Sequence, residues 1–376
     1  MAVNVVADQT ESAVQERGFA PTVMLPPLPH AGDAADDLAG DGAPDVVPTI
    51  GHIGRYELKR CLGQGGLGTV HAAWDPILSR TVAVKTLQLA GDIGGRDALD
   101  ALILNEARAA AGLSHPHIVT VYDAGRSEQG VYIAMERLRG RDLRQLLDEG
   151  WHPDPVQIAL IVRRVADALA YAHAKGVIHC DVKPANIFME GRTSPRVLDF
   201  GIARVAHGQA VAGFENLLAG SPHYLSPEQL RGQTPDRRSD VYSLGVVLYE
   251  LLAGRKPFAG GTLAQIAQAV LAGHAPRADK VEPDVPAELA RIAAKAMHPD
   301  PALRYRNARH LSQALRHWVE TEGDNQADDE AEEVPVRRWP RFASGVLLGL
   351  VLGVALTTAV AAWRGAQALP LATLLR

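Results

Sequence analysis

Hydrophobic and polar positions change their spacing along the chain, from a strand-like pattern near the beginning to a helical pattern later. Between residues 56 and 136, short runs rich in β-branched and apolar residues are separated by turns that contain Gly or Pro. Such runs are typical of β-strands, and one Ala- and Leu-rich helix over 97–113 interrupts them. The predicted strands cover 56–62, 69–74, 81–87, 118–123 and 131–136.

The second half of this region has the periodicity of amphipathic helices. The predicted helices cover 155–175, 240–253, 263–272, 287–297 and 307–318. A strand-rich beginning followed by a helix-rich remainder predicts an α+β protein of two lobes rather than an alternating βαβ fold.

The segment before this region lacks sustained periodicity. Residues 1–54 are rich in Ala, Pro, Asp and Gly, a composition that buries too little apolar surface to offset the entropy of ordering. We therefore expect a disordered N-terminal arm. The alternative is a docking or phosphorylated tail with Thr10, Ser12, Thr22 and Thr49 as acceptors. No apolar run follows Met1, so no secretory signal is expected.

The segment after it predicts a membrane anchor. Residues 319–342 are first acidic and then basic, and residues 343–363 carry no charge. Twenty-one residues of helix span about 31 Å, which matches a hydrocarbon core of about 30 Å. We expect one C-terminal transmembrane helix, followed by a short external tail at 364–376.

The charges that flank this span predict its orientation. Arg337, Arg338 and Arg341 precede it, whereas Arg364 is the one basic residue close behind it. Basic residues concentrate on the cytoplasmic side of membrane helices. The N-terminal side of the span is therefore expected in the cytoplasm.

Small residues recur every fourth position within the span. They are Gly345, Gly349, Gly353, Thr357 and Ala361. This spacing lets two helices approach closely and predicts a homodimer. The alternative is the ordinary glycine content of membrane helices.

Composition excludes some classes of function. The 38 Lys and Arg residues nearly balance the 43 Asp and Glu residues, so no nucleic-acid-binding surface is expected. Only two cysteines occur, Cys61 and Cys180. This low number favours a reducing compartment and no disulfide framework.

A Gly-rich stretch is the first candidate for chemistry. Residues 63–70 read Gly-Gln-Gly-Gly-Leu-Gly-Thr-Val, and glycines let a backbone approach phosphate oxygens closely. A dinucleotide-binding turn would continue into a helix. Residues 69–74 read instead as a strand, which favours a hairpin lid.

Three further motifs follow in order. Val-Ala-Val-Lys occupies 82–85, and Glu106 lies 21 residues after Lys85 in the predicted helix, where the two side chains are expected to form an ion pair. His-Cys-Asp-Val-Lys-Pro-Ala-Asn occupies 179–186. Asp-Phe-Gly occupies 199–201, and its Asp199 lies thirteen residues past Asn186.

With these motifs in this order, the chain resembles the protein kinase family, in its bacterial Hanks-type Ser/Thr branch. Ser-Pro-Glu at 226–228 takes the place of the family's Ala-Pro-Glu, and 239–245 and Arg304 match later motifs. The resemblance spans residues 55–318. It implies a two-lobed kinase fold and a non-specific Ser/Thr protein kinase that also phosphorylates itself. The Lys-Pro-Ala-Asn version of the catalytic loop is the Ser/Thr one.

The resemblance also implies a role for each matched residue. Asp181 accepts the substrate hydroxyl proton, Lys183 contacts the γ-phosphate, and Glu106 fixes Lys85 on the α- and β-phosphates. Asn186 and Asp199 bind Mg²⁺, with Mn²⁺ as the alternative metal. Glu228 and Arg304 form a structural ion pair. The implied ATP contacts are Leu62, Gly63, Gln64, Gly65, Gly66, Leu67, Gly68, Thr69, Val70, Ala83, Lys85, Met135, Glu136 and Leu138.

Two features depart from the family pattern. Cys180 stands where the family usually has an Arg that pairs with a phosphorylated activation loop. Residues 201–220 contain no Ser, Thr or Tyr, and Ser221 replaces a structural Thr. The usual phosphorylation switch is therefore expected to be absent, and Cys180 is expected to be a packed thiol rather than a redox site.

Two alternatives to an active kinase remain. A membrane-anchored pseudokinase scaffold would be favoured by the loss of Lys85, Asp181, Asn186 or Asp199, all of which are present. A nucleotide-binding oxidoreductase would need a second dinucleotide feature. The expected partners are Ser/Thr-containing proteins and, through one helix, the plasma (inner) membrane.

Overall fold

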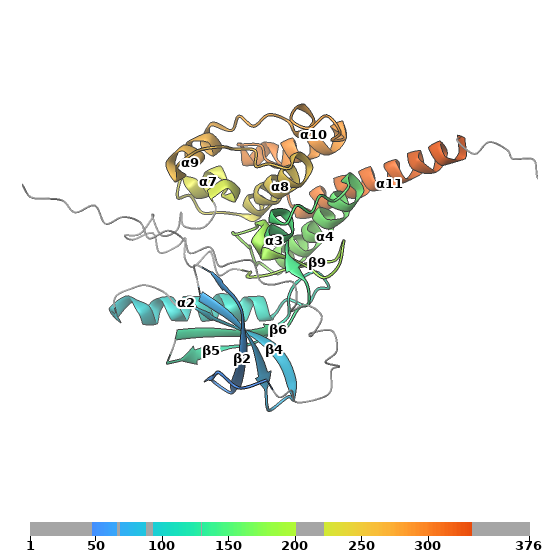
Figure 1. The fold of residues 1–376 in the computed structure, drawn as a ribbon. Helices are drawn as coiled ribbons and strands as arrows, with labels where there is room; N and C mark the ends of the chain where they lie inside the picture. Colours follow the sequence, from blue (N-terminus) through green and yellow to red (C-terminus); the bar gives the residue numbers. More distant parts are fainter. Residues whose placement is uncertain (1–46, 66–67, 88–92, 129, 201–221, 333–376) are drawn as a thin grey trace, which may run out of the picture.

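The structure, a computed structural model, describes residues 47–65, 68–87, 93–128, 130–200 and 222–332. They form a β-rich lobe followed by a helical lobe, as Figure 1 shows, which confirms the two-lobed α+β prediction. Most of the predicted N-terminal arm and all of the predicted membrane span lie outside these ranges. Within them, no helix combines the length and apolar character needed to cross a membrane.

The first lobe is built on one antiparallel sheet with strand order β1-β2-β3-β4-β6-β5. The strands pair in sequence order up to β4, and β6 then lies between β4 and β5. Their bounds are β1 Gly51–Ile53, β2 Tyr56–Gly65, β3 Gly68–Asp75, β4 Arg80–Leu87, β5 Val121–Ser127 and β6 Gly130–Glu136.

Alternate residues of these strands fill two separate hydrophobic clusters, because successive side chains point to opposite faces of a sheet. Val82, Val84, Tyr132 and Ala134 belong to the cluster on one face. Ala83, Leu87, Ile133 and Met135 belong to the cluster on the other face. Lys85 shares the parity of Ala83 and Leu87, so β4 directs it towards the second face.

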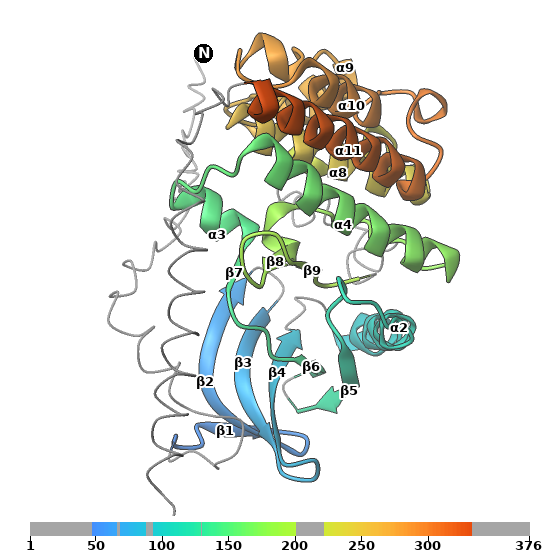
Figure 2. The same cartoon turned by 90° about the vertical axis from the view of Figure 1, so that its right-hand side faces the viewer.

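Among the described residues, helix α2 (Ile93–Ala111) covers this second face. Its buried residues Ile103 and Ala107 pack in the same cluster as Ile133 and Met135. Figure 2 shows α2 nearly end-on beside β5. The helix begins four residues before the predicted 97 and ends two before the predicted 113.

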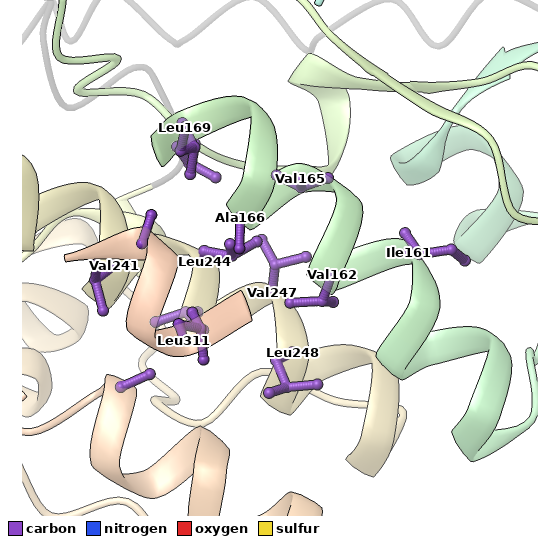
Figure 3. Close-up of a cluster of buried hydrophobic side chains, with 14 of the residues drawn as sticks. Ile161, Val162, Val165, Ala166, Leu169, Val241, Leu244, Val247, Leu248 and Leu311 are labelled. Atoms are coloured by element: carbon purple, nitrogen blue, oxygen red, sulfur yellow. The ribbon is translucent and has the colours of Figure 1, made fainter. Parts of the chain in front are cut away.

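The second lobe consists mainly of helices around one large hydrophobic core. Figure 3 shows its centre, where Val162 and Val165 of α4 lie near Leu244 and Val247 of α8. The helix bounds are α3 Leu143–Asp148, α4 Pro155–Ala174, α7 Pro227–Leu230, α8 Arg237–Ala253, α9 Leu263–Ala272, α10 Ala287–Ala296 and α11 Ala308–Glu332, with 3-10 turns η1 Pro184–Asn186, η2 Pro222–Tyr224, η3 Ala278–Lys280 and η4 Pro301–Leu303.

Helix α8 is the central element of this lobe. Every residue from Ser239 to Leu252 is buried, as expected for a helix that is packed on all sides. Gly245 permits close contact with α10, since a Cβ there would lie 2.7 Å from the Cβ of Ala296. The lobe is therefore organised around α8, which makes it a rigid support for the loops at its N-terminal end.

Some predicted boundaries are wrong. The predicted strand 118–123 begins only at Val121, because Ile118 pairs instead with Val197 of β9 (Pro195–Val197). Helix α11 does not end at Trp318 but continues through part of the acidic stretch to Glu332, where Glu, Ala and Gln are good helix formers. The small sheet of β7 (Arg141–Asp142), β8 (Ile187–Met189) and β9 was not predicted.

Candidate active site between the lobes

Lys85 and Asp199 join the two lobes at the centre of the site. The Nζ atom of Lys85, on β4, lies 2.6 Å from Oδ2 of Asp199, which follows β9. Both side chains are largely buried. Burial would raise the pKa of Asp199, but the nearby Lys85 ammonium outweighs it and lowers the pKa below its ordinary value. Asp199 is therefore an ionised carboxylate at neutral pH.

The expected ion pair between Lys85 and Glu106 is not formed in the part of the chain that the structure describes. Glu106 is half-buried on α2, and the described ion pair of Lys85 is with Asp199. The physical reason is that an ammonium attracts the nearest carboxylate most strongly, and the fold places Asp199 beside Lys85. An apolar cavity of about 20 Å³ lies between Ala107 of α2, Met135 and Phe200.

The predicted catalytic loop brings Asp181, Lys183 and Asn186 together. Lys183 Nζ lies 2.7 Å from Asp181 Oδ2. Asn186 donates from its Nδ2 to the carbonyl oxygen of Asp181 at 2.8 Å and to its Oδ2 at 2.9 Å. The amide oxygen of Asn186 consequently points away from Asp181. It remains available to a cation.

His179 connects this loop to the segment that carries Asp199. Its Nε2 lies 2.8 Å from the carbonyl oxygen of Leu198, and its Nδ1 accepts from the backbone N–H of Asp181 at 3.2 Å. A ring with its proton on Nε2 satisfies both bonds. The ring also packs on Phe200, with centroids 4.7 Å apart. One side chain thus fixes Asp181 and Asp199 relative to each other.

Two residues of the site have left-handed backbones although neither is glycine. The φ angles of Cys180 and Asp199 are 65° and 58°. Such conformations cost on the order of 1–3 kcal/mol and persist only where the surroundings hold them. At Cys180 the N–H donates to Asp240 Oδ1 at 2.8 Å, and the carbonyl oxygen accepts from Gln229 Nε2 at 2.9 Å. The thiol is buried and forms no disulfide.

Asp240, the fourth residue of α8, is the main anchor of the loop. It also accepts from the backbone N–H of His179 at 2.9 Å and from Nε2 of His173 at 2.7 Å. Burial would raise the pKa of Asp240, but these bonds lower it below its ordinary value. The motif at 239–245 was recognised in the sequence, but this anchoring role was not.

The Gly-rich stretch is a hairpin, as predicted. Strand β2 pairs with β3 up to Gly65 and Gly68, and a strand rather than a helix follows Gly68. Gly68 is required by its close approach to β4, since a Cβ there would lie 1.7 Å from the carbonyl oxygen of Thr86. Gly66 and Leu67, at the tip, lie outside the described residues.

The predicted adenine-contacting residues lie at the end of β6. In the ladder with β4, Met135 is paired with Ala83 and Glu136 with Val82. Leu138 follows in the connection between the lobes and packs against the cluster under α2. The carboxylate of Glu136 forms an ion pair with Arg196 of β9. No signal in the sequence singled out Arg196.

The predicted structural ion pair is present in the helical lobe. Arg304 donates from Nη1 and Nη2 to the two carboxylate oxygens of Glu228, at 2.7 and 2.8 Å. Ser239 donates to Glu228 Oε1 at 2.7 Å. Burial would raise the pKa of Glu228, but these donors outweigh it and lower the pKa below its ordinary value. The prediction for Glu228 and Arg304 is confirmed.

The donor set supplies two of the ligands of a magnesium ion. The Asp199 carboxylate and the Asn186 amide oxygen are oxygen ligands of the kind that Mg²⁺ prefers. Among the described residues, no group of three or more His, Cys, Asp or Glu side chains forms a metal site by itself. Since Mg²⁺ is usually held by one or two carboxylates together with substrate phosphates, two protein ligands are enough for a nucleotide-dependent site.

Sequence comparison places this site among known proteins. The profile of the protein kinase domain family matches residues 56–319. The chain is 36% identical over 263 residues to the Ser/Thr protein kinase PrkC of Bacillus subtilis, covering 70% of this chain and 40% of that protein. It is 41% identical over 265 residues to PknB of Mycolicibacterium smegmatis, covering 68% and 41%. The match thus spans about two fifths of these relatives.

Structural comparison agrees. The kinase domain of PknI from Mycobacterium tuberculosis, in a C20A mutant, superposes with a TM-score of 0.58 at 26% identity. The match covers 73% of this chain and 99% of that domain. The two-lobed arrangement described above is therefore shared with a solved bacterial kinase domain.

Proposed function

Since the chain belongs to the protein kinase family, we propose that it is an active Ser/Thr protein kinase. It transfers the γ-phosphate of Mg-ATP to protein hydroxyls and also to itself. The observation that carries the proposal is a pair of charged groups, Lys85 with Asp199 and Asp181 with Lys183 and Asn186. Each of these side chains has a role in phosphoryl transfer. His179 connects the two groups through Leu198 and Asp181.

Asp181 orients the acceptor hydroxyl and accepts its proton. Its carboxylate is held by Asn186 and by Lys183, so it is positioned before a substrate arrives. Lys183 lies 2.7 Å from the carboxylate, where its ammonium also faces the negative charge of a transferring phosphoryl group. Positioning and charge stabilisation supply most of the catalysis in this chemistry.

The family uses ATP with Mg²⁺, and the residues present fit both. Asp199 and the amide oxygen of Asn186 would hold the metal, which neutralises charge on the phosphates when bound. Lys85 forms an ion pair with Asp199 in the structure. We infer that Lys85 moves to the phosphates and towards Glu106 when the nucleotide binds, which frees Asp199 for the cation.

The competing function is a pseudokinase scaffold. The two are separated by phosphate transfer from radiolabelled ATP to a general protein substrate, measured with the full chain. Lys85→Met and Asp181→Asn should each abolish transfer, whereas Lys295→Met, at an exposed lysine of α10, should not. Transfer that survives both site substitutions at the wild-type rate would exclude the proposed site.

We also propose that the chain is anchored in the plasma membrane with the kinase domain in the cytoplasm. The support is the uncharged stretch at 343–363 and the excess of Arg before it. ATP is available on the same side. Fractionation of cells tests the anchor, and protease treatment of intact spheroplasts tests the side. Digestion of the kinase domain in intact spheroplasts would indicate the opposite orientation, with the kinase domain outside the cytoplasm.

A homodimer through the transmembrane helix is the last part of the proposal. Gly349 and Gly353 lie on the small-residue stripe of the span, and close helix approach depends on such residues. A membrane association assay on residues 337–366 should show weaker pairing for Gly349→Ile and Gly353→Ile. Equal association of wild type and variants would leave the stripe as ordinary membrane composition.

A further inference from the structure

Arg196 is a largely buried arginine that joins three separate segments near the connection between the lobes. Its Nη2 forms an ion pair with Glu136 and donates to the carbonyl oxygen of Ile118 at 3.1 Å. Its Nη1 lies 3.3 Å from Oε2 of Glu190. Only 14% of the side chain is exposed. A planar guanidinium suits this task because its fork of donors reaches several oxygens at once.

Glu136 is restrained on its other side by the segment before β5. Its backbone N–H donates to the carbonyl oxygen of Thr120 at 2.9 Å, and its Oε2 lies 3.4 Å from the backbone nitrogen of Thr120. Glu136 is the last residue of β6. Its position therefore sets where the chain leaves the sheet, at the residues predicted to contact adenine.

The backbone next to Arg196 is fixed by hydrogen bonds to the segment before β5. The neighbouring Val197 is paired with the segment before β5 in both directions, through Val119 N to Val197 O at 3.0 Å and Val197 N to His117 O at 2.9 Å. Asp199 lies two residues after Val197 in the same stretch of chain. Arg196 thus links the adenine end of the site to the segment that carries the predicted metal ligand.

We propose that Arg196 is a positioning residue for nucleotide binding, which acts by holding Glu136 and the start of the interlobe connection in the geometry that accepts adenine. The inference rests on the proposed function, because it concerns the same nucleotide site. Arg196 is not one of the predicted ATP contacts, and it acts through its ion pair with Glu136. Its effect is expected at the adenine end, because the segment that leads to Asp199 is held by the backbone hydrogen bonds of Val197 without the Arg196 side chain.

The charge balance predicts how the site responds when Arg196 is lost. One guanidinium lies between two carboxylates, Glu136 and Glu190. An apolar residue in its place leaves two like charges without the cation that separates them, and these repel. Glu136 then moves towards solvent, and the connection that follows it loses its fixed start.

The experiment measures direct binding of two ligands to the full chain by calorimetry. Adenosine reports the adenine end alone, and Mg-tripolyphosphate reports the phosphate and metal end alone. Arg196→Met should weaken adenosine binding about tenfold, which corresponds to the loss of one charge-assisted hydrogen bond. Tripolyphosphate binding should stay within about twofold. In turnover, KM for ATP should rise while kcat stays nearly constant.

Three further variants distinguish positioning from general support of the fold. Arg196→Lys should recover part of the affinity, because a single ammonium reaches fewer oxygens. Glu136→Gln should weaken adenosine in the same way, and the Arg196→Met/Glu136→Gln pair should be clearly less than additive. Glu190→Gln, which leaves the contact with Glu136 intact, should bind both ligands like wild type.

Equal weakening of adenosine and tripolyphosphate, or additive effects at Arg196 and Glu136, would overturn the inference. Should Arg196→Met fail to fold, Glu136→Gln tests the same contact from its other side. Because binding is measured without turnover, a chain that binds adenosine but transfers no phosphate would refute the proposed activity alone. The role of Arg196 would still be decided by the two ligands.

Discussion

Asp240 holds Cys180 in a left-handed conformation through a hydrogen bond of 2.8 Å from the Cys180 N–H to its Oδ1. Cys180 is the residue immediately before the proposed catalytic base, Asp181. Asp240 lies on a helix that is buried on all sides. The core of the helical lobe therefore helps to align the loop that carries the proposed catalytic base, together with the loop's own His179 and Asn186.

Asp240→Asn tests this alignment. The carboxylate accepts from three donors, His173, His179 and Cys180, and an amide has one oxygen and one NH₂ group. At least one donor then loses its acceptor, which costs about 1–3 kcal/mol when buried. We expect a fall in kcat of about tenfold or more with little change in KM for ATP. Stopped-assay kinetics and denaturant unfolding measure the two effects.

The control for that substitution is Asp236→Asn, at the N-cap of the same helix. Asp236 is half exposed and forms hydrogen bonds with Arg238. Asp236→Asn should therefore lower stability slightly and leave kcat unchanged. A wild-type kcat in Asp240→Asn would show that the loop keeps its geometry without this anchor.

The ion pair of Lys85 with Asp199 predicts different effects for Lys85 and Glu106 in the nucleotide-free protein. Lys85→Met removes the ammonium that lowers the pKa of Asp199, so burial should raise that pKa, visible in a carboxyl NMR titration. Glu106→Gln should leave the Asp199 pKa unchanged, because the described partner of Lys85 is Asp199.

Lys85→Met and Glu106→Gln should both reduce turnover. Loss of a charge-stabilising group commonly costs about 10²–10³-fold in rate, and we expect Lys85→Met and Asp199→Asn to fall in this range. Glu106→Gln should lower kcat less than Lys85→Met. An Asp199 pKa that responds equally to Glu106→Gln and Lys85→Met would mean that Glu106 already acts on Lys85 without nucleotide.

The buried pair Glu228–Arg304 predicts a pH-dependent contribution to stability. The pKa of Glu228 is lowered in the folded protein, so its contribution is present above the ordinary pKa of about 4.3 and is lost as pH falls through the lower folded value. In Arg304→Met, burial instead raises that pKa. We expect the free energy of unfolding of Arg304→Met to be lower than that of wild type by about 3–5 kcal/mol at pH 7. This penalty should shrink below about pH 4.

Urea unfolding of both proteins between pH 3 and 8 measures this. The matched control is Arg291→Met, which breaks the exposed pair with Glu288 and should cost no more than about 1 kcal/mol. A penalty for Arg304→Met that stays constant with pH would rule out an electrostatic origin.

Activity without phosphorylation of the activation segment follows from two features. Cys180 replaces the usual Arg, and residues 201–220 have no Ser, Thr or Tyr. Phosphatase-treated enzyme should therefore phosphorylate an exogenous substrate at the rate of untreated enzyme. A large loss that autophosphorylation at Ser221 or Tyr224 restores would contradict this. In the structure the Tyr224 hydroxyl is buried against Glu250 at 2.5 Å.

The grouping of side chains in the predicted catalytic loop could be predicted from the sequence because each of them lies in one short local motif. Asp181, Lys183 and Asn186 lie within six residues of one another, and the structure brings their side chains together. The strand after Gly68 and helix α4 also follow from local patterns, since periodicity and turn residues act over a few positions. The ion pair Glu228–Arg304 was predicted only through the resemblance to a family.

The tertiary structure decided what depends on residues far apart in the chain. The sequence predicted that Lys85 pairs with Glu106, but in the structure it pairs with Asp199, which lies 114 residues away. Arg196 carries no local signal, and the motif at 239–245 did not reveal that Asp240 anchors the catalytic loop. The importance of both residues comes from the segments that folding places beside them. Gly68 was predicted as an ATP contact, and the structure adds a packing reason for glycine, since a Cβ there would lie 1.7 Å from the carbonyl oxygen of Thr86. Local patterns specify which groups are available, but the close packing of distant segments determines which of them meet.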